Sequence, residues 1–242
     1  MNKKIFALFS FLLLLPVSYA VKFDVTVEEI LNFKAENLNY ELDENLLLLN
    51  ISIYNIGSTG SFCRVRFEVF ENGKMVNSFW SEKKTILPGD FENFQIIGFL
   101  EKSGNYTGRI RGYCGNEIFH FGNISFEVEK NYTSSSILKI RSVSSSLNEI
   151  EILFIPKVSG DIYIIPLEYP ISWIVVGEKV KVERGIMEKV SLWFNGPLFN
   201  NTIKIGFVGK DGVLIEEVRI EKKENFLDLF FKFFKSFLLG LS

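Results

Sequence analysis

The sequence predicts an all-β protein whose strands form two β-sandwich domains in tandem. The first observation is an alternation of apolar and polar residues with period two, from Val21 to about Lys222, which is typical of strands with one face in a core and one in water. The second is that turn residues, such as Glu71-Asn72-Gly73 and Pro88-Gly89-Asp90, interrupt this alternation. Strands at this spacing, without helical patterns between them, indicate β-sandwiches.

The first 20 residues have the pattern of a secretory signal peptide. Lys3-Lys4 gives a basic start, an apolar run follows from Ile5 to Leu15, and Ser18 and Ala20 are small residues at the −3 and −1 positions of a cleavage point. The apolar run is shorter than the roughly 20 residues of a spanning helix, so an uncleaved anchor is the less favoured alternative. We therefore predict an exported protein at the outer face of the cell membrane or the cell surface.

The alternation divides into two parts of similar size. About seven strands are predicted before Lys130 and about seven after Ser136, and residues 131–136 between them are small and polar, as in a linker. The predicted order is a first sandwich at 21–130, the linker, and a second sandwich at 137–222. Each part has about the 100 residues of an immunoglobulin-like sandwich, and one large sandwich is the alternative.

The chain contains two cysteines, Cys63 and Cys114. Because an exported protein meets an oxidising environment, a disulfide between them is the default expectation, and two unrelated buried thiols are the alternative.

Four turn motifs separate the predicted strands of the first part: Asn55-Ile56-Gly57, Glu71-Asn72-Gly73, Leu87-Pro88-Gly89 and Gly104-Asn105-Tyr106. With these motifs, residues 47–128 resemble the CARDB-type immunoglobulin-like domains of archaeal and bacterial cell-surface proteins. The resemblance implies an immunoglobulin-like fold and an association with adhesion and surface display. In that topology the third and sixth strands are antiparallel neighbours, so the start of the strand with Cys63 meets the end of the strand with Cys114. The second part resembles this family poorly, and its sandwich is predicted from alternation alone.

Residues 223–242 break the period-two alternation and predict a short amphipathic, hydrophobic C-terminal helix. An interfacial helix lying on a membrane fits best, because the segment is short for a spanning helix and contains charges. Packing on the chain's own domain or on a partner subunit is the alternative, and the lysines at 232 and 235 argue against a glycolipid-anchor signal. The residues predicted to contact the membrane or a partner are Phe226, Leu227, Leu229, Phe230, Phe231, Phe233, Phe234, Phe237, Leu238 and Leu241.

Five N-x-S/T sequons mark candidate N-glycosylation sites. They are at Asn50, Asn105, Asn123, Asn131 and Asn200. Asn50 and Asn123 fall on the outward phase of their predicted strands, where a glycan is sterically tolerated. Ordinary polar surface residues are the alternative.

The sequence contains few candidates for catalytic or metal-binding residues. It contains no G-x-S-x-G elbow, phosphate loop, H-E-x-x-H or dinucleotide fingerprint. His120, the single histidine, lies on a predicted strand among phenylalanines and is expected to be a partly buried structural residue. The carboxylates of residues 41–44 lack the spacing of a calcium loop, so solvated charges are favoured. We predict no catalytic residue, cofactor or metal site, and a hydrolase that uses two carboxylates is the remaining enzymatic alternative.

The chain has 27 basic and 29 acidic residues, a formal net charge of −2, which argues against a nucleic-acid partner. Trp80, Trp173 and Trp193 lie in strand-like runs, where core packing is a commoner use than a sugar-stacking platform. The sequence therefore predicts a non-enzymatic surface protein with a structural, adhesive or protein-interaction role. It would contact the membrane, or a membrane-bound subunit, through its C-terminal helix. A carbohydrate-binding module of a secreted or surface complex is the alternative.

Overall fold

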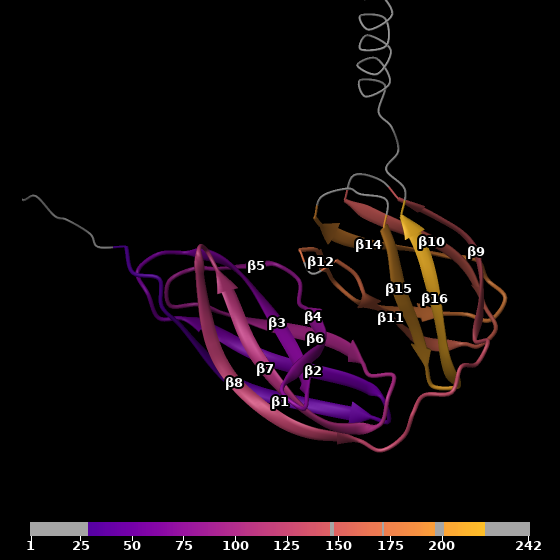
Figure 1. Cartoon of the computed structure of the whole chain (residues 1–242). Coiled ribbons are helices and arrows are strands. Elements are labelled where there is room, and N and C mark those ends of the chain that lie inside the picture. Colours follow the sequence, from indigo (N-terminus) through magenta and orange to yellow (C-terminus); the bar gives the residue numbers. More distant parts are fainter. Residues whose placement is uncertain (1–28, 146–147, 171, 197–200, 221–242) are drawn as a thin grey trace, which may run out of the picture.

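The computed structural model describes residues 29–145, 148–170, 172–196 and 201–220 (Figure 1). Within these residues the chain forms strands and no helix, which confirms the predicted all-β class. The N-terminal half holds β1 (Phe33–Asp43), β2 (Leu46–Asn55), β3 (Ser61–Glu71), β4 (Lys74–Trp80), β5 (Lys84–Ile86), β6 (Phe91–Phe99), β7 (Gly104–Cys114) and β8 (Glu117–Val128). The C-terminal half holds β9 (Leu138–Ser145), β10 (Glu149–Pro156), β11 (Gly160–Glu168), β12 (Ile174–Val175), β13 (Glu178–Val182), β14 (Glu188–Asn195), β15 (Asn201–Gly209) and β16 (Gly212–Ile220). The predicted signal peptide and C-terminal helix lie outside the described residues.

The strands form four sheets with antiparallel pairing. In the N-terminal half the orders are β1-β2-β6 and β4-β3-β7-β8, with β5 paired to β3. In the C-terminal half they are β12-β14-β10-β9 and β13-β11-β15-β16. Both halves therefore carry two antiparallel sheets, consistent with a β-sandwich.

Alternating side chains build the cores. On β3, Val65, Phe67 and Val69 are fully buried, whereas Arg64 and Arg66 project from the opposite face. The apolar residues of β1, β2 and β6 pack into the same cluster from the facing sheet. A second cluster fills the C-terminal half with side chains from both of its sheets. Burial of these apolar faces is what stabilises the predicted strands.

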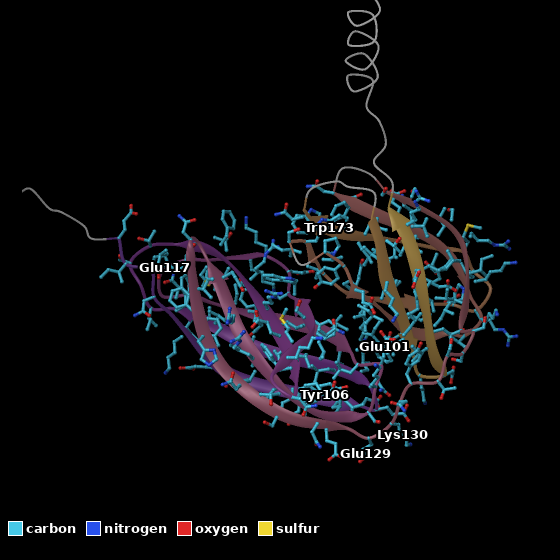
Figure 2. The ribbon with its side chains drawn as sticks, in the orientation of Figure 1. Glu101, Tyr106, Glu117, Glu129, Lys130 and Trp173 are labelled. Carbon is cyan, nitrogen blue, oxygen red and sulfur yellow. A yellow bond between two sulfur atoms is a disulfide. The ribbon has the colours of Figure 1, made fainter. Side chains whose placement is uncertain are left out.

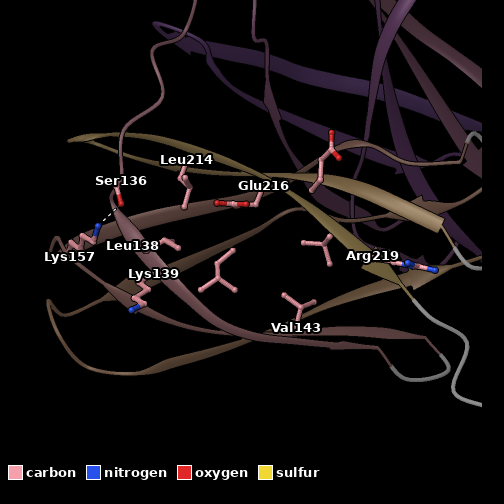
Figure 3. Close-up of a pocket in the computed structure, with 11 residues that line it drawn as sticks. Ser136, Leu138, Lys139, Val143, Lys157, Leu214, Glu216 and Arg219 are labelled. Carbon is pink, nitrogen blue, oxygen red and sulfur yellow. Dashed lines mark hydrogen bonds between the residues drawn. The ribbon is translucent and has the colours of Figure 1, made fainter.

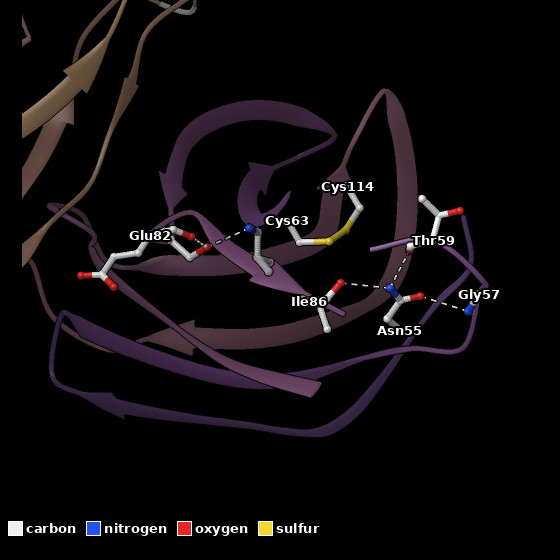
Figure 4. The surroundings of a disulfide bond; sticks show 9 residues. Asn55, Gly57, Thr59, Cys63, Glu82, Ile86 and Cys114 are labelled. Carbon is white, nitrogen blue, oxygen red and sulfur yellow. Dashed lines mark hydrogen bonds between the residues drawn. A yellow bond between two sulfur atoms is a disulfide. The ribbon is translucent and has the colours of Figure 1, made fainter. Parts of the chain in front are cut away.

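The Asn-x-Gly motif after β2 fixes the turn that precedes β3 (Figure 4). The buried amide nitrogen of Asn55 donates to the carbonyl oxygens of Thr59 (2.8 Å) and Ile86 (3.0 Å). Its Oδ1 accepts a hydrogen bond from the backbone N–H of Gly57 at 3.0 Å. A Cβ at position 57 would lie 2.1 Å from the carbonyl oxygen of Ile30, so only glycine fits there.

The described chain contains eight strands in each half, where alternation predicts about seven. The two shortest strands, β5 and β12, have three and two residues. Elements this short are too brief for a period of two to be recognised.

The predicted linker, residues 131–136, is bonded to both halves. The backbone N–H of Tyr132 donates to the carbonyl oxygen of Glu101 at 3.1 Å. The N–H of Ser135 donates to the carbonyl oxygen of Val213, and the N–H of Val213 donates to the hydroxyl of Ser135. The segment is therefore fastened to β16 as well as to the N-terminal half, which a free polar tether would not be.

Candidate functional site

A disulfide joins Cys63 of β3 to Cys114 of β7, as predicted (Figure 4). The two residues lie directly opposite each other in the antiparallel pair and are fully buried. The bond locks the register of β3 against β7, and this register decides which side chains meet on the outward face of the sheet.

That outward face is rich in arginine. In the β3–β7 register, Arg66 lies opposite Arg111, and Glu68 lies opposite Arg109. Arg64 is on the same face of β3, one position of the alternation further along. We call these five side chains the arginine face. Like charges directly opposite each other destabilise a sheet, so the Arg66–Arg111 pair requires compensation.

Glu68 supplies that compensation. Its Oε2 accepts from Arg109 Nε at 2.7 Å and lies 3.4 Å from Arg111 Nε, while its Oε1 lies 3.3 Å from Arg66 Nη1. The Glu68 side chain is only 3% exposed. One carboxylate therefore holds three guanidinium groups, and the local charge remains positive in a chain whose net charge is −2.

The arginines also pack on aromatic rings. Arg66 lies over Trp80 at 5.2 Å, Arg64 over Trp193 at 5.3 Å and Arg109 over Phe70 at 4.8 Å, measured to the ring centroids. These distances are within the range of cation–π attraction. The aromatic rings therefore help to position the guanidinium groups, as the Glu68 carboxylate also does.

Two guanidinium nitrogens are buried without a hydrogen-bond partner in the described part of the chain: Nη1 of Arg64 and Nε of Arg66. Arg64 is 8% exposed, and this burial lowers the pKa of its guanidinium. The arginine face thus has more N–H donors than Glu68 and the surrounding acceptor atoms can satisfy.

The side of the face toward β8 is open. A shallow hollow of about 500 Å³ is lined by Arg109, Arg111, Ile118, Phe119, His120 and Asn123. In the β7–β8 register, Arg111 lies opposite His120 and Arg109 opposite Asn123. We call this the arginine hollow. His120 is exposed there, so the expectation of a partly buried structural histidine is wrong. A bulge between Ile110 and Arg111 shifts the alternation of β8 relative to β7.

The two halves meet at the other side of the arginine face. Ile165, Leu167 and Val208 of the C-terminal half join the apolar cluster of the N-terminal half. Lys204 pairs with Glu101 at 2.8 Å. Figure 2 labels Glu101 at this junction. Although burial of Lys204 opposes its charge, its hydrogen bonds to Glu101 and Glu168 raise its pKa.

Tyr169 links the halves by a hydrogen bond. Its hydroxyl donates to the carbonyl oxygen of Ser78 at 2.7 Å. Burial raises the pKa of Tyr169 to about 12, although the hydrogen bond to Ser78 and the charge of Arg66 act in the opposite direction. The neutral phenol is therefore the form that the junction accepts.

This geometry predicts that the effect of Tyr169→Phe on the free energy of unfolding changes sign with pH. At pH 8 the loss of the hydrogen bond should lower the free energy of unfolding by about 1 kcal/mol. Above pH 10 the unfolded wild type loses the phenol proton before the folded one does. The free energy of unfolding of the wild type then falls by about 1.4 kcal/mol per pH unit up to pH 12 because of this residue alone. Urea denaturation at pH 8 and 11.5 should show the variant less stable at the first pH and more stable at the second. Parallel pH profiles would contradict the buried phenol.

A second concave surface lies between the edge strands β9 and β16 (Figure 3). Its apolar lining is Leu138, Ile140, Val143, Leu214 and Val218, and Lys139, Glu216 and Glu217 are charged residues at the same groove. Lys157 donates a hydrogen bond to the hydroxyl of Ser136 at one end. The lining carries charges of both signs, so it does not select a particular ligand chemistry.

The predicted glycosylation sites are exposed wherever the structure describes them. Asn50, Asn105, Asn123 and Asn131 all have exposed side chains, and Asn200 lies outside the described residues. Asn131 accepts hydrogen bonds from the backbone and hydroxyl of Ser103. Asn123 lines the arginine hollow, so a glycan there would stand beside it.

The tryptophans do not form a platform. Trp173, labelled in Figure 2, is fully buried and stacks on Phe194. Trp80 is 7% exposed, and Arg66 lies over its ring. Trp193 is 38% exposed, and Arg64 lies over its ring. A shared flat surface for stacking a sugar is therefore excluded for these three residues.

The remaining predicted positions add no site. Among the described residues, no group of three His, Cys, Asp or Glu side chains is arranged to hold a metal ion. The carboxylates of Glu41, Asp43 and Glu44 are exposed at the turn between β1 and β2. The described part of the chain also lacks a helix long and apolar enough to cross a membrane. The predicted tail contacts, from Phe226 to Leu241, lie outside the described residues.

No protein-family model and no curated protein sequence matches the chain. Among solved structures, the chain is similar to red sea bream transglutaminase at 8% identity and a TM-score of 0.27, with 77% of this chain and 31% of that chain covered. It is also similar to the N-terminal periplasmic domain of ScsB from Proteus mirabilis at 8% identity and a TM-score of 0.29, with 77% and 92% covered. The chain thus spans about a third of the transglutaminase. At these TM-scores neither similarity supports a functional argument.

Proposed function

We propose that the chain is an exported, non-enzymatic cell-surface protein with an adhesive, structural or protein-interaction role. In this proposal residues 1–20 direct export. Residues 21–130 and 137–222 are immunoglobulin-like sandwiches joined by 131–136. Residues 223–242 hold the protein at a membrane surface or on a membrane-bound subunit. The signal-peptide pattern and the disulfide support export, because disulfides persist in oxidising compartments.

The observation that carries the binding role is the arginine face. Arg109 and Arg111 present guanidinium groups on the outside of a sheet that the Cys63–Cys114 bond holds in register. Guanidinium groups that a rigid sheet holds in place are suited to recognising a partner, since little side-chain or backbone order has to be gained on binding. The contacts between the halves add to this rigidity.

The immunoglobulin-like interpretation is supported by the pairing of the two strands that carry Cys63 and Cys114. The resemblance implies the third and sixth strands, and β7 is the sixth when the three-residue β5 is left out. The bridge joins strands of one sheet, whereas antibody domains bridge their two sheets. Membership of the CARDB-type group rests on the turn motifs alone, and the role of Asn55 shows why one of them is needed for the fold.

Cell fractionation tests the membrane association. The full chain and a chain ending at Asn225 are expressed, and membranes are washed with high salt and then with carbonate. We expect the full chain to stay with the membranes after high salt and the shortened chain to be released, because the Phe- and Leu-rich tail supplies the apolar contact. Release of both forms would contradict a membrane role for the tail. A signal-peptide deletion retained inside the cell provides the matched control for export.

A further inference from the structure

The arginine hollow has free hydrogen-bonding capacity directed outward. Arg111 approaches Glu68 through Nε only, at 3.4 Å, and its side chain is 30% exposed. Its two terminal nitrogens have no carboxylate partner within the described residues. Arg109, 34% exposed, places Nε and Nη2 on the same oxygen of Glu68. The buried unpaired nitrogens of Arg64 and Arg66 show the same excess of donors on the inner side of the face.

The charge of this surface is local rather than a consequence of composition. The chain as a whole has two more acidic than basic residues, yet three arginines gather around one buried carboxylate. Such a surface attracts anionic groups, and guanidinium groups bind carboxylates in a planar, bidentate manner. The ligand should therefore carry carboxylates.

The spacing of the donors favours a polypeptide. Arg109 and Arg111 are two residues apart on β7, which separates their side chains by about 6.6–6.8 Å. Side chains two residues apart on an extended peptide repeat at the same distance, so alternate acidic residues can meet both arginines. Ile118, 60% exposed at the hollow, offers an apolar contact.

We propose that the arginine hollow binds an extended acidic segment of a partner protein, with carboxylates of alternate residues on Arg109 and Arg111 and an apolar side chain on Ile118. The inference rests on the proposed protein-interaction role and gives that role a ligand chemistry. A glycan on Asn123 would obstruct the site, because Asn123 lines the same hollow.

Binding is measured by fluorescence anisotropy with the purified full chain and a labelled peptide of alternating glutamate and threonine. We expect binding that weakens as ionic strength rises, and no binding of the matching lysine–threonine peptide. Arg111→Gln should weaken binding about tenfold, since it removes a charged contact at the interface. Arg141→Gln, an exposed arginine on β9, is the matched control and should leave the affinity unchanged.

Ile118 provides a second test that is independent of the Glu68 network. Ile118→Glu should abolish binding by repulsion, whereas Ile118→Arg should preserve or strengthen it. Equal affinity of wild type, Arg111→Gln and Ile118→Glu would overturn the proposal. Binding of polygalacturonate with no binding of the acidic peptide would overturn the choice of a polypeptide ligand. If the wild-type protein fractionates with membranes but does not bind the acidic peptide, this inference is wrong while the proposed membrane association stands.

Discussion

Replacing Cys63 and Cys114 together by alanine should lower the free energy of unfolding by about 4 kcal/mol. The disulfide joins residues that are 51 apart, so it removes a large amount of conformational freedom from the unfolded chain. For a sandwich of about 100 residues the midpoint of thermal unfolding should fall by roughly 16–32 °C. The measurement is guanidinium or thermal denaturation of the oxidised wild type beside the double variant.

Two controls separate the bond from the side chains. Reduced wild type keeps both sulfur atoms, so any difference between it and the double variant measures the small cavities left by alanine. Thiol titration of the denatured, unreduced protein should find no free thiol. Reduced protein and double variant as stable as oxidised wild type would show that the bond constrains nothing important in the unfolded chain.

The sequence predicts the disulfide and, through it, the pairing of two strands. Export and the presence of two cysteines indicate the bond, and the bond fixes the register of the two strands. That register places Arg66 opposite Arg111 and Glu68 opposite Arg109. The arginine face is therefore present in the sequence as two alternating runs, Arg64-x-Arg66-x-Glu68 and Arg109-x-Arg111. Alternation alone predicts that such side chains point away from the core, and only the register shows that they meet.

Other features depend on contacts between distant segments. Trp80 is buried because Arg66 and Tyr113 cover it, and neither is its neighbour in sequence. The contact of Tyr169 with Ser78 joins residues 91 apart. Segment 131–136 is small and polar, which predicts a linker, yet its backbone finds partners on β16. Local sequence patterns do not predict such pairings. They indicate the conformation that a segment prefers, but not which distant segment packs against it.

The second large effect is expected for Glu68→Gln. The substitution leaves Arg66, Arg109 and Arg111 around a neutral amide, so their mutual repulsion is no longer compensated. Removing one partner of a buried ion pair costs about 3–5 kcal/mol, and since Arg109 and Arg111 are about a third exposed we expect the lower end, about 3 kcal/mol. Urea denaturation at low ionic strength measures the effect.

Salt and a surface control make the prediction specific. Added salt screens the repulsion among the arginines, so the deficit of Glu68→Gln should shrink as ionic strength rises. Glu92→Gln removes an exposed carboxylate that lies 3.6 Å from Lys84 and should change stability by less than about 1 kcal/mol. A Glu68→Gln variant within that same margin would show that the arginines turn to solvent without needing the carboxylate.

Stability and binding should move in opposite directions in Glu68→Gln. Glu68 competes with an external carboxylate for the same guanidinium groups, so its removal frees Arg109 and Arg111 for the acidic peptide. We expect the variant to be less stable and to bind the peptide more tightly. Without the Glu68 carboxylate, the N–H donors of Arg109 and Arg111 are available to the ligand. A purely structural arginine cluster predicts a different result: the variant would be destabilised and its affinity for the peptide would be unchanged or lower. Denaturation and anisotropy on the same preparation therefore distinguish a cluster that only stabilises the sheet from one that also recognises a partner.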